Sequence, residues 1–254
     1  MANPPEFQVP SGGAAAAVLP GVSVRRKTPR QLFWERLRQD KAALIGGGVI
    51  ILLILTAIFG GPIAQALTGH QPNDIVPGSQ DAFGLPTGPS SHLIFGADAE
   101  GRDLFVRTLY GARISLFVGL VASGLAVFIG LVVGLTAGFF GGIVDTVLSR
   151  FADVLLAVPQ ILIAVGIVTA CSTTKQGCLG GLLTPGVTVV IAVITLFSWS
   201  YIARIVRGYT LSLREKEFVE SARAAGAGTF RILWQEIVPN LIGPIIVYTT
   251  LLIP

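Results

Sequence analysis

The sequence is poor in charged residues and in the side chains from which catalytic sites are built. Asp, Glu, Lys and Arg make up only 13% of its 254 residues, about half the share in a typical soluble domain. The two histidines are isolated, so no zinc site is indicated, and none of the four lysines has the context of a G-x-x-x-x-G-K-[ST] phosphate-binding loop. We therefore expect no catalytic residue, no metal and no cofactor, and a chain that cannot hold ATP by itself.

Apolar residues, by contrast, are abundant and lie in long runs. They make up 52% of the chain, and the mean hydropathy is +0.74. Five long apolar stretches are free of Asp, Glu, Lys and Arg; four are long enough to span a membrane, which takes roughly 20 apolar residues, and the fifth has 18 and reaches the end of the chain. The sequence thus predicts an all-α, polytopic membrane protein in a lipid bilayer. The predicted helices lie at about 42–66, 114–139, 154–173, 185–205 and 238–254.

The apolar stretches are also informative for what they exclude. Transporters driven by protons or ions usually bury Asp, Glu, Lys or Arg within their spans. Because the stretches contain none of these residues, the sequence argues against a secondary transporter and against a proton pump.

Positive charge is concentrated directly before the first span. Residues 25–41 carry seven Lys or Arg against two Asp or Glu. Such a cluster could bind nucleic acid, but its position favours the positive-inside rule, so we expect a cytoplasmic N-terminus and no nucleic-acid partner. Residues 1–41 are then a cytoplasmic tail with a basic flank. Its first part, 1–24, is rich in Pro, Gly and Ala and is expected to be disordered.

Residues 67–112 are predicted to form an extracytoplasmic loop. The first part of the loop is rich in turn-forming residues. Between residues 104 and 114, however, apolar side chains recur at near-helical spacing with charged residues between them. We expect a short interfacial helix there that leads into the second span.

Four crossings from a cytoplasmic N-terminus return the chain to the cytoplasm. Residues 204–236 carry six Lys or Arg against four Glu, which agrees with that side. Within this segment 217–225 has the pattern of a helix, Gly226 ends it, and Thr229 can cap a second helix. Residues 211–238 are thus predicted to form a helix–turn–helix that either lies on the lipid surface or docks a cytosolic partner.

Small residues recur in the second predicted span. Gly130, Gly134 and Gly138 follow one another at every fourth position. Small residues at this spacing let a neighbouring helix approach closely. They predict helix packing rather than chemistry.

The two cysteines lie close together after the third predicted span. If the segment with Cys171 and Cys178 is extracytoplasmic, a disulfide can form. Two free thiols are an equal alternative, and the sequence leaves both open.

Several blocks of the sequence resemble the permeases of ATP-binding-cassette importers. One of them, "ESARAAGAGTFRILWQEIVPN", looks like the coupling loop of the dipeptide and oligopeptide branch. The blocks "FWERLRQDKAALIGGGVIILLIL", "FGADAEGRDLFVRTLYGARISL" and "GFFGGIVDTVLSRFADVLLAVP" are similar to the same branch, so the resemblance covers about residues 33–254. The residues that match the family's "EAA…G…LP" loop, or lie within it, are Glu220, Ser221, Ala222, Arg223, Gly226 and Pro239.

The resemblance implies a fold, partners and residue roles. The fold would be the transmembrane domain of a type I importer, with residues 113–254 as its core, in the second permease subunit of a pair. The loop would insert into a groove of a separate ATPase subunit, with Glu220 as the charged contact, Ala222 as the close-packing point and Gly226 as the turn. The implied partners are a second homologous permease, two cytosolic ATPases that hydrolyse the ATP, and an extracytoplasmic solute-binding protein.

The sequence departs from the family pattern in three respects. Ser221 stands where the family usually has Ala, and Val238 where it usually has Leu, and both changes are mild. The family also has a sixth span, whereas five are visible here; either the sequence is truncated before the sixth or the pathway is lined differently. The implied function is import of dipeptides or oligopeptides across the cell membrane. Nickel chelates, glutathione or haem are alternative cargoes, and a passive channel or secondary transporter is the less favoured class.

Overall fold

The computed structural model describes residues 28–173, 177–181 and 183–251, and these form helices and connecting segments without a β-strand. The tail predicted at 1–24 and the last three residues of the fifth predicted span lie outside the described residues. The helices are α1 (Pro29–Gln39), α2 (Lys41–Leu55), η1 (Thr56–Gly60), α3 (Gly61–Thr68), α4 (Leu104–Phe140), α5 (Gly142–Ala157), α6 (Gln160–Ser172), η2 (Leu179–Gly181), α7 (Val187–Leu213), α8 (Glu217–Ala224), α9 (Thr229–Arg231), η3 (Ile232–Ile237) and α10 (Val238–Leu251).

The chain divides into two compact units, Met1–Ile50 and Ile51–Pro254. The first contains α1 and the greater part of α2. Asp40 begins α2, since its carboxylate accepts a hydrogen bond of 3.1 Å from the backbone N–H of Ala43. The helical residues from Lys41 to Thr68 are numerous and apolar enough to cross a membrane.

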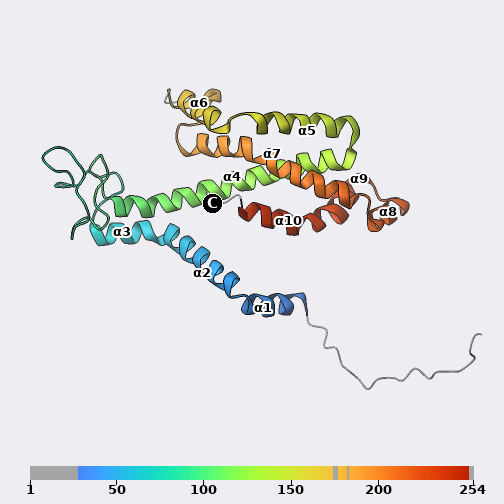
Figure 1. The fold of residues 1–254 in the computed structure, drawn as a ribbon, viewed down its shortest axis with the longest axis horizontal. Helices are drawn as coiled ribbons and strands as arrows, with labels where there is room; N and C mark the ends of the chain where they lie inside the picture. The colour runs from blue at the N-terminus through green and yellow to red at the C-terminus, as the bar shows by residue number, and fades with distance from the viewer. Residues whose placement is uncertain (1–27, 174–176, 182, 252–254) are drawn as a thin grey trace, which may run out of the picture. The chain divides into compact units, whose positions relative to one another are not determined.

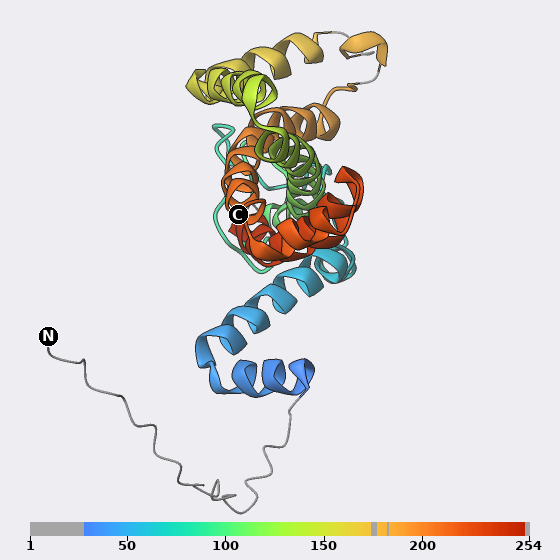
Figure 2. The same ribbon diagram turned by 90° about the vertical axis from the view of Figure 1, so that its right-hand side faces the viewer.

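The centre of the second unit is the pair α4 and α7. The two helices lie side by side, with α10 next to them (Figures 1 and 2). Gly130, Gly134 and Gly138 of α4 face α7: a Cβ on Gly134 would lie 2.6 Å from the carbonyl oxygen of Ala203, and one on Gly130 would lie 2.8 Å from that of Trp199. Real Cβ atoms do not approach so closely, so this packing requires glycine at both positions.

α4 differs from the prediction at its start. It runs without a break from Leu104 to Phe140, so the interfacial helix expected before the second span forms the first turns of the span helix itself. Asp103 caps it, accepting a hydrogen bond of 2.9 Å from the N–H of Phe105. No proline follows in α4 to interrupt the helix.

The third predicted span, 154–173, is not one straight helix. α5 and α6 are bent by 82° at Val158 and Pro159. Val158 is extended because the ring of a following proline disfavours the helical conformation. The described residues therefore contain four helices able to span a membrane, or five if α5 and α6 together make one span.

The two cysteines form a disulfide, which decides between the two alternatives left open by the sequence. Cys171 lies at the end of α6 and is buried among Val189, Val193 and Phe197 of α7. The disulfide joins this helix end to the segment that leads into α7.

Candidate functional site

The candidate site is the short helix α8 and the turn after it, which together connect α7 with the last span. Glu217 and Glu220 lie in the first turn of α8, where acidic side chains are favoured by the helix dipole. At its end Ala227 donates a hydrogen bond of 3.0 Å to Ala222, and Gly226 donates one of 2.9 Å to Arg223. With Gly226 at φ 79°, this is a Schellman motif, and it confirms the predicted glycine turn.

α8 is anchored to the membrane helices through one fully buried side chain. Val219 lies in an apolar cluster with Leu135 of α4 and with Ile202 and Val206 of α7. The same cluster contains Ile232, Ile237 and Leu241 from the last helical segment. Because interiors are close-packed, this cluster holds α8 firmly against these helices.

Two arginines tie the site to the end of α4. Arg214 follows α7 and donates a hydrogen bond of 3.0 Å to the carbonyl oxygen of Gly138. A cation at these last carbonyls satisfies acceptors that have no partner within the helix. Arg223, from α8, lies 5.7 Å from the ring centroid of Phe139, within cation–π distance.

The opposite side of the site is exposed and combines negative charge with apolar surface. Glu220 and Ser221 are exposed on α8. On the following helical segment the rings of Phe230 and Trp234 lie 6.0 Å apart, and these side chains are 74% and 53% exposed. Exposed aromatic groups next to charges are typical of a surface that contacts another protein.

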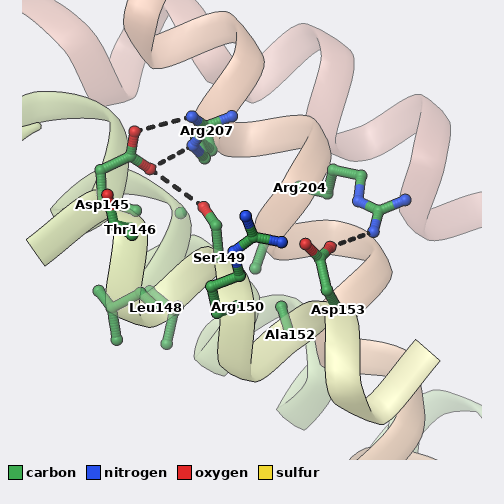
Figure 3. Close-up of a pocket in the computed structure, with 13 residues that line it drawn as sticks. Asp145, Thr146, Leu148, Ser149, Arg150, Ala152, Asp153, Arg204 and Arg207 are labelled. Carbon is green, nitrogen blue, oxygen red and sulfur yellow. Dashed lines mark hydrogen bonds and ion pairs between the residues drawn. The ribbon is translucent and has the colours of Figure 1, made fainter. Parts of the chain in front are cut away.

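A second polar feature lies beside the same ends of α4 and α7. It is a cavity of about 420 Å³ between α5 and α7, shown in Figure 3. Arg207 makes a bidentate ion pair with Asp145, in which Nη2 of the arginine lies 2.7 Å from Oδ2 of the aspartate. Arg204 makes a second ion pair, in which its Nη2 lies 2.5 Å from Oδ1 of Asp153. α5 and α7 thus extend beyond the uncharged stretches of the sequence, and the cavity is lined by charged residues that lie just outside those stretches.

Two family models match the chain. Residues 130–254 match the binding-protein-dependent transport system inner membrane component, and residues 28–83 match the N-terminal transmembrane domain of oligopeptide transport permease C. The glutathione transport system permease protein GsiD of Salmonella typhimurium is 41% identical over 225 residues, which are 89% of this chain and 68% of the relative. The chain belongs to the permease family of ATP-binding-cassette importers. It is therefore a multi-pass membrane protein with the transmembrane domain of a type I importer.

Two further relatives of this permease come from Bacillus subtilis. The dipeptide transport system permease protein DppC is 36% identical over 221 residues, which are 87% of this chain and 62% of the relative. The oligopeptide transport system permease protein OppC is 37% identical over 221 residues, which are 86% of this chain and 65% of the relative. The similarity thus extends over most of the permease.

The structure brings most of the predicted loop residues of the permease together. Glu220, Ser221, Ala222 and Arg223 lie on α8, and Gly226 forms its turn. Pro239 lies apart from them, in the first turn of α10. The six residues before α10 widen into a π-helical turn, which accommodates a proline that lacks an N–H and would clash with an α-helical carbonyl.

One predicted role in the loop is wrong, and one residue was missed. Thr229 does not cap the second helix: Gly228 occupies the N-cap position in an extended conformation, and no side chain makes a capping bond there. Arg214 was not singled out, because its partner carbonyl on Gly138 is 76 residues away in the sequence. The only local indication of such a contact is that Arg214 lies at the end of a helix, where basic side chains can bind backbone carbonyls.

Proposed function

We propose that this permease is one of two permease subunits of an ATP-driven importer of dipeptides and oligopeptides. It would form the translocation pathway with a second, homologous permease, and two cytosolic ATPases and an extracytoplasmic solute-binding protein would complete the complex. The names of the relatives, which concern dipeptide, oligopeptide and glutathione transport, support this cargo class. Glutathione is the second candidate, because the 41% identical relative carries it in its name.

The proposed orientation places the N-terminus and α8 in the cytoplasm. The basic residues at 25–41 and the net positive segment at 204–236 support it. The loop between α3 and α4 then faces outward, as does the disulfide after α6. An outward position suits a disulfide, since such bonds persist in oxidising compartments.

The main support for the proposal is that α8 is buried on one side and exposed on the other. Val219 is fully buried against the membrane helices, whereas Glu220 one residue later is exposed. The helix therefore has one side fixed to the spans and one side free for a partner. The sequence contains no phosphate-binding loop, so we infer that the free side receives motion from an ATPase subunit.

The transport step follows from this arrangement. Closure of the two ATPases on ATP would displace α8, and its buried contacts would carry the displacement into α4 and α7. Spans that move as packed bundles would then expose the pathway alternately to the two sides. This chain would thus transmit the energy of hydrolysis without catalysing a reaction itself.

The test compares loop variants in the complete complex, reconstituted in proteoliposomes with its ATPases and solute-binding protein. We expect Glu220→Arg and Gly226→Val to abolish receptor-stimulated ATPase activity and uptake of a labelled dipeptide. The matched control is Asp74→Arg, a charge reversal at an exposed residue of the loop between α3 and α4, which should leave both activities in place.

Unchanged coupled activity in both loop variants would refute the proposal, as would uptake that persists without any ATPase. Competition between labelled dipeptide, unlabelled oligopeptide and glutathione in the same vesicles distinguishes the cargo classes. Full inhibition by glutathione alone would favour the second candidate.

A further inference from the structure

The cavity between α5 and α7 carries more positive charge than its own carboxylates neutralise. Its lining includes Arg150, Arg204 and Arg207 but only Asp145 and Asp153. The hydroxyl groups of Thr146 and Ser149 also line it. The cavity is therefore a polar site with a net charge of about +1.

The excess charge can be assigned to one residue. Arg207 is paired with Asp145, and Arg204 with Asp153. Arg150 is exposed, and within the described residues no ion pair or hydrogen bond is formed by its guanidinium group. Figure 3 shows Arg150 on α5 between Ser149 and Asp153, beside the Arg204 pair. An arginine in this position offers up to five donors to an anion.

The side of α5 that carries Arg150 is otherwise apolar and exposed. Ile143, Val147 and Val154 lie seven and three residues before it and four residues after it, so they form one stripe with Arg150 on the helix surface. Their side chains are 82%, 60% and 61% exposed. A ligand held by Arg150 would therefore touch an apolar surface next to its charged group.

The cavity lies toward the ends of α4 and α7, and the ends of a spanning helix reach the lipid headgroups. Gly134 and Ala137, which line it, lie in the last two turns of α4, and Arg204 and Arg207 lie in the last three turns of α7. α8 follows this end of α7 and contacts this end of α4. In the orientation proposed above, the cavity opens in the cytoplasmic leaflet, where basic pockets between membrane helices bind anionic headgroups.

We propose that this cavity binds the phosphodiester group of an anionic phospholipid, with Arg150 as the main charged contact and the acyl chains along the stripe of Ile143, Val147 and Val154. The hydroxyl groups of Thr146 and Ser149 donate to Gly142 and Asp145 within α5, so the donors offered to the headgroup are those of Arg150. The stripe favours a lipid over a free phosphate, because a soluble anion would gain nothing from it. The inference rests on the proposed orientation of the permease.

The test measures lipid retention by the full-length chain, purified in mild detergent with its partner subunits. Native mass spectrometry gives the binding of phosphatidylglycerol relative to phosphatidylcholine with the same acyl chains. We expect the unchanged protein to prefer phosphatidylglycerol, and Arg150→Gln to reduce this preference about fivefold, the effect expected from one basic residue near the membrane surface. Arg150→Lys, which retains the charge, should keep the preference.

The matched control is Arg113→Gln, since Arg113 is an exposed arginine near the opposite end of α4. It should leave the preference for phosphatidylglycerol unchanged. Equal binding of both lipids to the unchanged protein, or an unaltered preference in Arg150→Gln, would overturn the proposal. Displacement of phosphatidylglycerol by inorganic phosphate, at matched ionic strength, would show a site for free phosphate and would overturn the assignment to lipid.

The outcome is separable from that of the proposed function, because lipid retention requires no transport. A preference for phosphatidylglycerol that depends on Arg150, found together with full coupling in Glu220→Arg, would refute the coupling role of α8 alone. Equal binding of both lipids to the unchanged protein, found together with loss of coupling in Glu220→Arg, would refute the lipid site alone.

Discussion

The guanidinium group of Arg214 donates a hydrogen bond of 3.0 Å to the carbonyl oxygen of Gly138, 76 residues earlier in the sequence. Gly138 lies in the last turn of α4 and Arg214 directly follows α7. The contact therefore holds the corner from which α8 departs against the end of a neighbouring span. It adds a polar restraint to the apolar one made by Val219.

Arg214→Gln is expected to loosen this corner. The side chain of Arg214 is 26% exposed, so the loss of a charged hydrogen bond to helix-end carbonyls should lower stability by about 1 kcal/mol. Receptor-stimulated ATPase activity should fall with it, because α8 would move independently of α4. Unfolding by denaturant and the coupled ATPase assay measure the two effects. Lys216→Gln, at an exposed residue two positions later, should change neither, and a change of equal size in both variants would contradict the role of Arg214.

Gly134→Ala is expected to separate α4 from α7. The added Cβ would lie 2.6 Å from the carbonyl oxygen of Ala203 and 2.7 Å from the Cβ of Val206, and neither atom can move aside cheaply. Overpacking of this kind costs about 1–3 kcal/mol. Unfolding of the purified protein in mixed micelles measures this cost.

The same helix provides the control for this substitution. A Cβ on Gly124 meets no atom within 4 Å, so Gly124→Ala should leave stability unchanged or raise it by up to about 1 kcal/mol, because alanine favours the helix. Equal effects of the two substitutions would show that helix propensity, and not the contact with α7, is what glycine provides at position 134.

The Asp145–Arg207 pair is expected to couple α5 to α7 energetically. Its two side chains are 17% and 34% exposed and bind each other in a bidentate manner. A double-mutant cycle with Asp145→Asn and Arg207→Gln should therefore give a coupling energy of about 1–2 kcal/mol.

The Asp153–Arg204 pair serves as the comparison, because it joins the same helices but is 48% and 58% exposed. Solvent screening should reduce its coupling energy to below about 1 kcal/mol. A larger coupling energy for this exposed pair than for Asp145–Arg207 would contradict the prediction that the less exposed pair couples the two helices more strongly.

The loop between α3 and α4 is expected to lose order in acid. Burial raises the pKa of Asp98, but hydrogen bonds from the backbone and side chain of Arg102, together with the charges of Arg102 and Arg107, outweigh it and hold this pKa below its ordinary value of 3.8. A lowered pKa means that the carboxylate stabilises the loop fully above the pKa of the unfolded chain. That stabilisation is lost as the pH falls through the pKa of the folded loop.

Hydrogen exchange of residues 75–103, corrected for the intrinsic rate, measures this effect. In the unchanged protein, protection should be constant above about pH 4 and decrease below it. Asp98→Asn should lower protection about fivefold at neutral pH and remove the pH dependence. Asp74→Asn, at an exposed position, should retain it. Acid sensitivity that survives in Asp98→Asn would assign the effect to another group.

The sequence by itself determined the class of the molecule, the approximate positions of the spans and the glycine turn at Gly226. These features depend on local properties: the length of an apolar run, the spacing of small residues, and the freedom of glycine to adopt a positive φ. The motif around Glu220 also led to the permease family. The sequence did not locate the bend at Val158, because its apolar run continues across Pro159.

Only the tertiary structure decided which distant residues meet. It paired Asp145 with Arg207 across 62 positions, placed Arg214 on the carbonyl of Gly138 and joined Cys171 to Cys178. A charged or small residue has the same local pattern whichever neighbour it finds, so such pairs follow from how the helices pack and not from periodicity. For the same reason, the sequence could not predict the polar cavity beside Arg150, because the cavity exists only where α5 packs against α7.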